Sequence, residues 1–302
     1  MRRKRQMLFI INPRSGKGQI RPKLLDILNL FSAAGYQVQV HITQHALDAK
    51  QVVVSDGGKK DLIVCSGGDG TLNEVISGMM QIDPARLPQL GYIPAGSTND
   101  FASSLGLPKQ MPAAARMAVT GTGFPVDIGS FCEDRHFVYV AGFGAFTDVS
   151  YMTPQDRKNL LGHQAYMLET VRSLTTIKSY HMSFSWEGQR LEGEFIFGMV
   201  TNTISVGGFK GLVNQDVSLN DGLFEVLLIR TPKNPADLSA LVTEIFTKDE
   251  PASELVYRFK TRELDIHSEE AVDWVLDGEF GGSRTDVHVE NLCQRLEIRR
   301  TV

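Results

Sequence analysis

DLIVCSGGDGTLNEV, residues 61–75, is the stretch that decides the fold. The apolar run at residues 62–65 predicts a buried strand, and it leads into Gly67-Gly68-Asp69-Gly70. Three glycines in these four residues allow positive φ angles and let a ligand approach the backbone closely. Thr71 and Glu74 have the spacing of a capping box, which predicts a helix that starts directly after the glycines.

This strand, turn and helix could bind a phosphate group, or they could form a tight turn without a ligand. A helix N-terminus presents free N–H groups and the positive end of the helix dipole, and both suit phosphate. Asp69 adds a carboxylate that could hold the Mg²⁺ of a nucleotide, directly or through water. The acid and the cap together favour a phosphate site.

Two other strands lead into similar loops. The apolar run at residues 7–11 precedes NPRSGKG (12–18), a basic, glycine-rich loop without the spacing of a Walker A motif. The run at residues 90–94 precedes AGSTNDFA (95–102), in which Ser97, Thr98 or Asn99 could instead cap the next helix. Ligands of open parallel sheets bind beyond the carboxyl ends of the strands, so we expect these loops to meet at one edge.

Beyond residue 123 the pattern changes from alternating strands and helices to mostly strands, many with alternating apolar residues. The predicted strands are residues 126–131, 136–143, 180–186, 194–201, 223–229, 255–260, 263–267, 274–276, 285–289 and 295–300, with helices near 158–174 and 235–246. Residues 121–123 (GTG) mark a break. We therefore predict an open α/β domain over residues 1–123 and a β-sandwich over 124–293, with the last strand (about 294–302) returning to the first domain.

Composition limits the classes of function. The 302 residues are 42% hydrophobic, as expected for globular cores, and the net charge of −4 argues against a dedicated nucleic-acid binder. The 3 cysteines are widely spaced and indicate reduced thiols in the cytoplasm. No apolar run approaches the ~18 residues of a membrane span. The basic residues 2–5 could be a solvated tail or could attract anionic lipid.

Two acidic turns stand out in the second half. LNDGL (219–223) and LDGE (276–279) each contain Asp-Gly, which is typical of a hairpin turn. Glu279 follows the second turn, near Trp274 and Phe280. Apolar surroundings would raise the pKa of Glu279 and suit it to take a proton from an alcohol, whereas a solvated glutamate is the plainer alternative.

The motifs GGDGTLNEV, PAGSTNDFA, LNDGLFEV and VLDGE, in this order, resemble those of the soluble diacylglycerol kinase family. This family belongs with the lipid kinases that include sphingosine and ceramide kinases. GGDGT alone is less specific, because NAD kinases and phosphofructokinases carry similar motifs. The resemblance covers nearly the whole chain and implies an α/β nucleotide-binding domain of the NAD-kinase and phosphofructokinase type, a β-sandwich, and an active site between them.

The resemblance also implies roles for individual residues. Asp69 and Asp100 would organise the catalytic Mg²⁺, and Glu279 would be the general base that deprotonates the lipid hydroxyl. Asp221, with backbone carbonyls near Ser218 and Leu223, would hold a second, structural Mg²⁺. The residues implied to contact ATP are Asn12, Pro13, Arg14, Ser15, Gly16, Thr43, Gly67, Gly68, Asp69, Gly70, Thr71, Leu72, Asn73 and Ser97.

We therefore expect an ATP- and Mg²⁺-dependent kinase that converts diacylglycerol to phosphatidic acid. The expected location is the cytoplasm, with peripheral contact at the inner membrane surface. The alternatives are a kinase for another alcohol, such as a sphingoid base, a prenol or NAD, and a regulator that binds nucleotide or lipid without turnover. The presence of Asp69, Asp100 and Glu279 favours an enzyme. The sequence leaves the acyl chains and a homodimer open.

Overall fold

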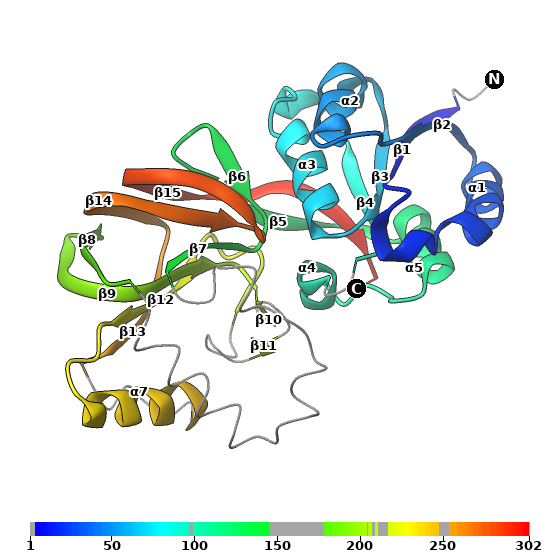
Figure 1. Cartoon of the computed structure of the whole chain (residues 1–302). Coiled ribbons are helices and arrows are strands. Elements are labelled where there is room, and N and C mark those ends of the chain that lie inside the picture. The colour runs from blue at the N-terminus through cyan, green and yellow to red at the C-terminus, as the bar shows by residue number, and fades with distance from the viewer. Residues whose placement is uncertain are drawn as a thin grey trace.

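The computed structural model describes residues 4–96, 99–144, 178–203, 205–206, 209–210, 217–247 and 254–301. Strands and helices alternate in the first part of the chain (Figure 1): β1 (Arg5–Ile11), α1 (Leu24–Ala33), β2 (Tyr36–Ile42), α2 (Asp48–Asp56), β3 (Leu62–Gly67), α3 (Asp69–Met79), β4 (Gln89–Pro94), α4 (Asp100–Ser104) and α5 (Met111–Thr120). Strands dominate the rest: β5 (Thr122–Phe131), β6 (Arg135–Phe137), β7 (Val140–Gly144), β8 (Tyr180–Trp186), β9 (Gln189–Thr201), β10 (Ser205–Val206), β11 (Phe209–Lys210), β12 (Phe224–Arg230), α7 (Pro235–Thr247), β13 (Val256–Thr261), β14 (Glu263–Leu276) and β15 (Glu279–Arg300).

The first part is a parallel sheet with helices on both faces, as predicted. Its strands lie in the order β2-β1-β3-β4, and each neighbouring pair is parallel. Leu8 and Ile10 pack with residues of α2 and α3 on one face, whereas Met7 and Phe9 pack with residues of α1 and α5 on the other. Burial on both faces explains why β1 and β3 are continuous apolar runs.

The second part is built from antiparallel strands around an aromatic core, which confirms the predicted β-rich class. Trp274 is 1% exposed there, with its ring centroid 5.1 Å from that of Phe143 and 5.3 Å from that of Phe131. The rings of Phe184 and Phe195 lie 4.9 Å apart in the same core.

Two strands are longer than the sequence pattern predicted. Residues 263–267 and 274–276 belong to one strand, β14, and residues 285–289 and 295–300 belong to β15. Irregular pairing between His267 and Val272, and between Leu292 and Leu296, interrupts the alternation that marks a single strand. The break predicted at residues 121–123 lies where α5 ends and β5 begins.

Strand β15 joins the two parts of the molecule. It pairs antiparallel with β14 and β5, and Ile298 pairs in parallel with Leu90 of β4. Within the described ranges, both parts therefore share one sheet of 13 strands. Figure 1 shows β15 running from the strand-rich part towards the helical part.

The helices of the second part are only partly described. Helix α7 confirms the helix predicted near residues 235–246, whereas the helix predicted near residues 158–174 lies outside the described residues. None of the helices that the structure describes is long and apolar enough to cross a membrane.

Helix α3 starts as predicted but is not closed by a capping box. Its N-cap residue is Gly68, which makes no side-chain cap. The Thr71 hydroxyl accepts a hydrogen bond from Asn12 Nδ2 (2.9 Å). The Glu74 carboxylate accepts from the backbone N–H of Leu47 (2.9 Å) and of Ala49 (3.2 Å), at the start of α2. The predicted cap was wrong because Glu74 caps the neighbouring helix.

Candidate active site

The loops after β1, β3 and β4 lie against one another at the carboxyl ends of their strands. Asn12 Nδ2 donates to Thr71 Oγ1, and the Ser15 hydroxyl accepts from the N–H of Gly68 at 3.2 Å. A Cβ on Gly96 would lie 2.8 Å from the Cα of Gly68, so these two backbones approach closely. Gly-rich loops gathered at one sheet edge form a surface suited to a polyanion.

Glycine is required at position 16, where the first loop meets the third. Gly16 has a φ of +55°, and a Cβ there would overlap the carbonyl oxygen of Ala95. Within the same loop the Asn12 carboxamide accepts from the N–H of Arg14 at 3.0 Å. At the neighbouring strand end, Thr43 donates through its N–H to the Ile11 carbonyl at 2.9 Å. Pro13 and Thr43 therefore flank the sheet edge at which these loops gather.

The first turn of α3 limits which N–H groups a phosphate could reach. Leu72 donates its N–H to the Gly68 carbonyl at 3.0 Å, so helical bonding begins at this residue. The Asn73 side chain is also engaged, because Nδ2 donates to the carboxylate of Asp277. Of the residues predicted to bind ATP on α3, those before Leu72 are best placed to do so.

The third loop is shaped by Asn99. This residue has a φ of 50°, its Oδ1 accepts from Gly96 N at 2.9 Å and its Nδ2 donates to Gly96 O at 2.8 Å. Both bonds hold the Asn99 side chain against Gly96, so it does not cap α4. Asp100 is the first residue of α4 and is 4% exposed. Ser97 lies outside the described residues, so its contact with a nucleotide stays a prediction.

Glu279 reaches this edge from the second part of the chain. Asp277 and Gly278 have φ angles of 51° and 87°, as a two-residue hairpin turn of type I′ requires. Glu279 follows as the first residue of β15. Its Oε1 lies so near the first turn of α3 that a Cβ on Gly70 would be only 2.5 Å away. The carboxylate is thus beside the positive end of the helix dipole.

Glu279 lies in solvated surroundings, the plainer of the two alternatives that the sequence left open. Glu279 is exposed, and Phe280 is 64% exposed beside it. Trp274 is buried in the aromatic core of the β-rich part. Of the two alternatives for Glu279, the solvated glutamate is confirmed and the acid held against Trp274 was wrong, because these two side chains belong to different surroundings.

Tyr139 connects the acids of the two parts. Burial raises the pKa of the Tyr139 hydroxyl, and the negative charges of Asp277, Asp69, Asp100 and Glu279 raise it further. All four carboxylates therefore lie within electrostatic range of one phenol. Tyr139 is 7% exposed and was not identified from the sequence, where it is one of several apolar residues in a predicted strand.

The Asp221 loop is held by a second buried acid. Asp127 is fully buried, and its carboxylate accepts from the N–H of Gly222 and from the N–H of Gln294, both at 2.7 Å. Gln294 lies in the irregular segment of β15 between Leu292 and Leu296. Asp127 thus fixes the loop and the bulge together. In the sequence it is a single acid within an apolar strand, a pattern that does not distinguish this role.

Asp221 has oxygen atoms that would suit Mg²⁺, but not a complete set of ligands. Its Oδ1 accepts from Leu223 N at 3.1 Å, and its Oδ2 is 3.9 Å from Lys260 Nζ. The Ser218 hydroxyl donates to Asn220 Oδ1. Within the described part of the chain, no group of 3 or more His, Cys, Asp or Glu side chains could hold a metal ion. A metal ion bound by Asp221, or one bound by Asp69 and Asp100, would therefore need backbone, phosphate or water oxygens as well.

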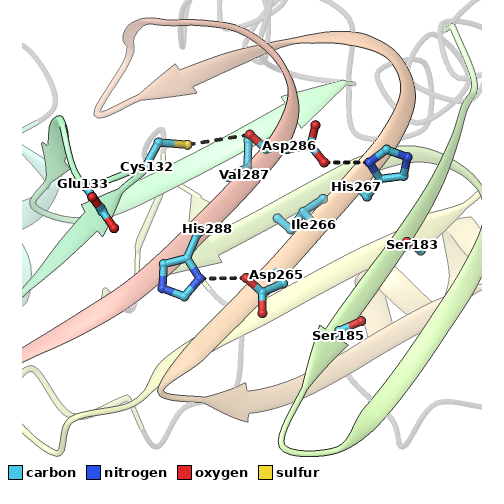
Figure 2. A pocket seen from close by; sticks show the side chains of 10 residues that line it. All are labelled: Cys132, Glu133, Ser183, Ser185, Asp265, Ile266, His267, Asp286, Val287 and His288. Carbon is cyan, nitrogen blue, oxygen red and sulfur yellow. Dashed lines mark hydrogen bonds and ion pairs between the residues drawn. The ribbon is translucent and has the colours of Figure 1, made fainter.

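A cavity of about 400 Å³ lies elsewhere, lined by strands β8, β14 and β15 and by the turn after β5. Figure 2 shows two cross-strand pairs there, His267 with Asp286 and His288 with Asp265, each with Nδ1 2.7 Å from a carboxylate oxygen. The bond to His267 lowers the pKa of Asp286. Each pair joins residues that lie opposite each other on β14 and β15. The pairs therefore indicate solvated cross-strand contacts rather than part of the candidate active site.

Comparison with known proteins places the chain in a family. The model described as the diacylglycerol kinase catalytic domain matches residues 6–131, and the model described as the YegS C-terminal NAD kinase beta sandwich-like domain matches residues 140–298. The diacylglycerol kinase of Bacillus subtilis (strain 168) is 34% identical over 276 residues, which is 91% of this chain and 89% of that protein. The diacylglycerol kinase of Staphylococcus aureus (strain MRSA252) is 32% identical over 299 residues, covering 99% of this chain and 92% of that protein.

Solved structures show the same fold. The crystal structure of a diacylglycerol kinase from Bacillus anthracis has a TM-score of 0.77 at 23% identity and covers 98% of this chain and 97% of that one. Another structure from that organism has a TM-score of 0.80 at 25% identity with the same coverage. From the family models and the relatives together, the chain belongs to the diacylglycerol kinase family and is a lipid kinase.

Proposed function

We propose that this lipid kinase transfers the γ-phosphoryl group of ATP to the hydroxyl of diacylglycerol and forms phosphatidic acid. The observation that carries the proposal is the position of Glu279 Oε1 beside Gly70, at the N-terminus of α3. An acid from the β-rich part thereby faces the loops suited to the phosphate donor. The relatives named diacylglycerol kinase support the choice of acceptor.

The ATP phosphates would lie along the loops after β1, β3 and β4. The loop at residues 12–16 and the segment Gly67–Thr71 would offer backbone N–H groups, and Thr43 and Ser97 would add hydroxyls. Asp69 and Asp100 are hard oxygen ligands of the kind that Mg²⁺ prefers, and phosphate and water oxygens would complete its shell. When bound, Mg²⁺ would neutralise charge on the phosphoryl group being transferred.

Glu279 would act on the acceptor. Its carboxylate takes the proton of the lipid hydroxyl, the oxygen forms a bond to the γ-phosphorus, and the bond from that phosphorus to the bridging oxygen of ADP breaks. The products are phosphatidic acid, ADP and the protonated Glu279. The enzyme itself does little covalent chemistry, so placement of the two reactants supplies most of the rate.

We also propose a division of labour along the chain. Residues 1–123 bind the donor, residues 124–293 carry the base, and residues 294–302 return to the first part, which the pairing of Ile298 with Leu90 supports. Asp221, with the carbonyls of Ser218 and Leu223, would hold a structural Mg²⁺. The enzyme would work in the cytoplasm and reach its lipid by peripheral contact with the inner membrane surface.

The test is purified protein with ATP, Mg²⁺ and diacylglycerol in mixed micelles. Wild-type protein should form phosphatidic acid, Glu279→Gln should abolish turnover while ATP binding persists, and Glu263→Gln, which changes an exposed acid of β14, should have no effect. A sphingoid base, a prenol and NAD are tested as competing acceptors. Phosphorylation of one of these acceptors without formation of phosphatidic acid would reassign the substrate. Normal turnover by Glu279→Gln would show that Glu279 is not the general base.

A further inference from the structure

Asp277 lies where the two parts of the molecule meet. It is the first residue of the turn between β14 and β15, and it is only 4% exposed. Asp-Gly turns are usually solvated, and a buried carboxylate is costly unless hydrogen bonds compensate it. Burial accordingly raises the pKa of Asp277, and bonds from the neighbouring backbone oppose that shift.

The Asp277 carboxylate is compensated by donors from both parts of the molecule. Oδ2 accepts from Asn73 Nδ2 at 2.6 Å and from Val138 N at 2.7 Å. Oδ1 accepts from Tyr139 N at 3.0 Å and from Val140 N at 3.1 Å. The N–H of Asp277 returns a bond to the Val140 carbonyl at 2.9 Å. The turn is thus attached to the segment between β6 and β7.

Asn73 attaches the same turn to the donor side. It lies on α3, one helical turn after Asp69, and its Nδ2 also donates to the His136 carbonyl at 3.2 Å. A single carboxamide therefore links α3 to β6 and to Asp277. The chain separation of 204 residues between Asn73 and Asp277 makes this a tertiary link between the two parts.

The link fixes the acid two residues further on. Asp277 has a φ of 51°, a conformation that non-glycine residues rarely adopt and that its hydrogen bonds maintain. From this turn the direction of Glu279 is set, and Glu279 Oε1 lies beside Gly70 on the same helix that carries Asn73. Helix α3 thus binds the hairpin turn through Asn73 and lies beside Glu279 at Gly70.

We propose that Asn73 and Asp277 are positioning residues that hold Glu279 at the N-terminus of α3. The inference rests on the proposed role of Glu279 as the base. Neither residue transfers a proton. Their bond sets the distance between the acid and the donor phosphates.

The link is tested by removing either partner. Asn73→Ala keeps the backbone of α3 and deletes the donor, whereas Asp277→Asn places an N–H group against existing donors. Each variant should lower kcat by about tenfold or more, because small misplacements of reacting groups are costly. The KM for ATP should stay within about threefold, since the phosphate loops are unchanged.

The exchanged pair, Asn73→Asp with Asp277→Asn, tests the bond itself. In this variant the amide at position 277 can donate to the carboxylate at position 73, so a donor and an acceptor again face each other. Its kcat should exceed that of Asp277→Asn by at least about threefold, because coupled neighbours are non-additive. A purely structural role for the two residues predicts no such recovery.

Two further measurements separate positioning from loss of stability. Phe31→Leu, in the core between α1 and β1, should lower Tm and leave kcat unchanged. Amide hydrogen exchange at Val138, Tyr139 and Val140 should be faster in Asp277→Asn than in wild type, whether or not substrate is present. This readout keeps the test valid if activity is too low to measure.

Wild-type kcat in Asn73→Ala and Asp277→Asn would overturn the inference. So would a kcat that falls only in proportion to the loss in Tm. The same holds if the kcat of the exchanged pair does not exceed that of Asp277→Asn. A failure of the proposed function would differ, because Glu279→Gln would then keep its activity. Loss of turnover in Glu279→Gln with full turnover in both link variants refutes the positioning role alone.

Discussion

Replacing Gly70 by alanine should separate stability from activity. Gly70 lies in the first turn of α3, with no positive φ, and alanine there should stabilise the fold by about 0.5 kcal/mol because it restricts the unfolded chain. The added Cβ would, however, lie 2.5 Å from Glu279 Oε1, whereas ordinary contact begins at 3.4 Å. The carboxylate must therefore retreat by the difference, about 0.9 Å.

A displacement of this size predicts a large kinetic effect. Misplacing a reacting group by about 1 Å can cost about 100-fold in rate, which corresponds to about 2.7 kcal/mol in the activation barrier. We expect kcat for phosphatidic acid formation to fall by about this factor, with Tm unchanged or raised. The assay measures product from radiolabelled ATP in mixed micelles, and calorimetry follows the unfolding of the same samples.

Gly78→Ala on the same helix is the matched control. A Cβ there would lie 2.8 Å from the Lys50 carbonyl oxygen and from Val53 Cβ, so it should push α3 away from α2 and lower Tm. Because this contact is on the side of α3 that faces α2, kcat should change little at a temperature where the protein is folded. Normal kcat in Gly70→Ala would refute the placement of Glu279. A loss of ATP binding in place of kcat would mean that position 70 acts through the phosphates instead.

Four further predictions concern single residues. Glu74→Ala removes the side chain that caps α2 and should lower the free energy of unfolding by about 1 kcal/mol in denaturant titrations, and an unchanged value would contradict the cap. Phe280→Ser should raise the KM for micellar diacylglycerol several-fold and leave the KM for ATP unchanged, because Phe280 is 64% exposed beside Glu279; a changed KM for ATP would count against this role. Burial raises the pKa of the Cys65 thiol, so a chromogenic disulfide should label it only after unfolding. Partial desolvation raises the pKa of the Cys293 thiol, and the charge of Asp127 raises it further, so labelling of this exposed thiol in the native protein should still accelerate as the pH rises above 9; equal native labelling rates for Cys65 and Cys293 would contradict the difference in their burial.

The strand, turn and helix around Gly67 could be predicted because the signals are local. The apolar run, the glycines and the polar helix start are adjacent in the sequence, and no distant partner is needed to explain them. The edge at which the loops meet could be predicted as well, because it follows from the geometry of parallel sheets. Glu279 could be singled out through the resemblance, and its residue type already favoured the solvated side chain that the structure has.

The contacts that hold the site together are not local, and for that reason the sequence pattern missed them. An Asp-Gly pair predicts a hairpin turn, which Asp277 forms, but only the approach of Asn73 from α3 shows why the carboxylate is buried. Glu74 has the spacing of a capping box, and its partners lie at the start of another helix. In both cases the sequence identified the residue that forms the contact, but its hydrogen-bond partner lies far away in the sequence.

The shared sheet restricts how the two parts of the molecule can move relative to each other. Glu279 begins β15, and at the far end of the same strand Ile298 pairs with β4, which leads into the loop before Asp100. The bond from Asn73 to Asp277 closes a second connection between the same parts. Rotation of the two parts as rigid bodies would have to break that bond or distort the bulge that Asp127 holds at Gln294. Glu279 is therefore in place before either substrate arrives, and under the proposed mechanism binding has to fit the lipid hydroxyl between Glu279 and the loops after β1, β3 and β4 rather than bring those groups together.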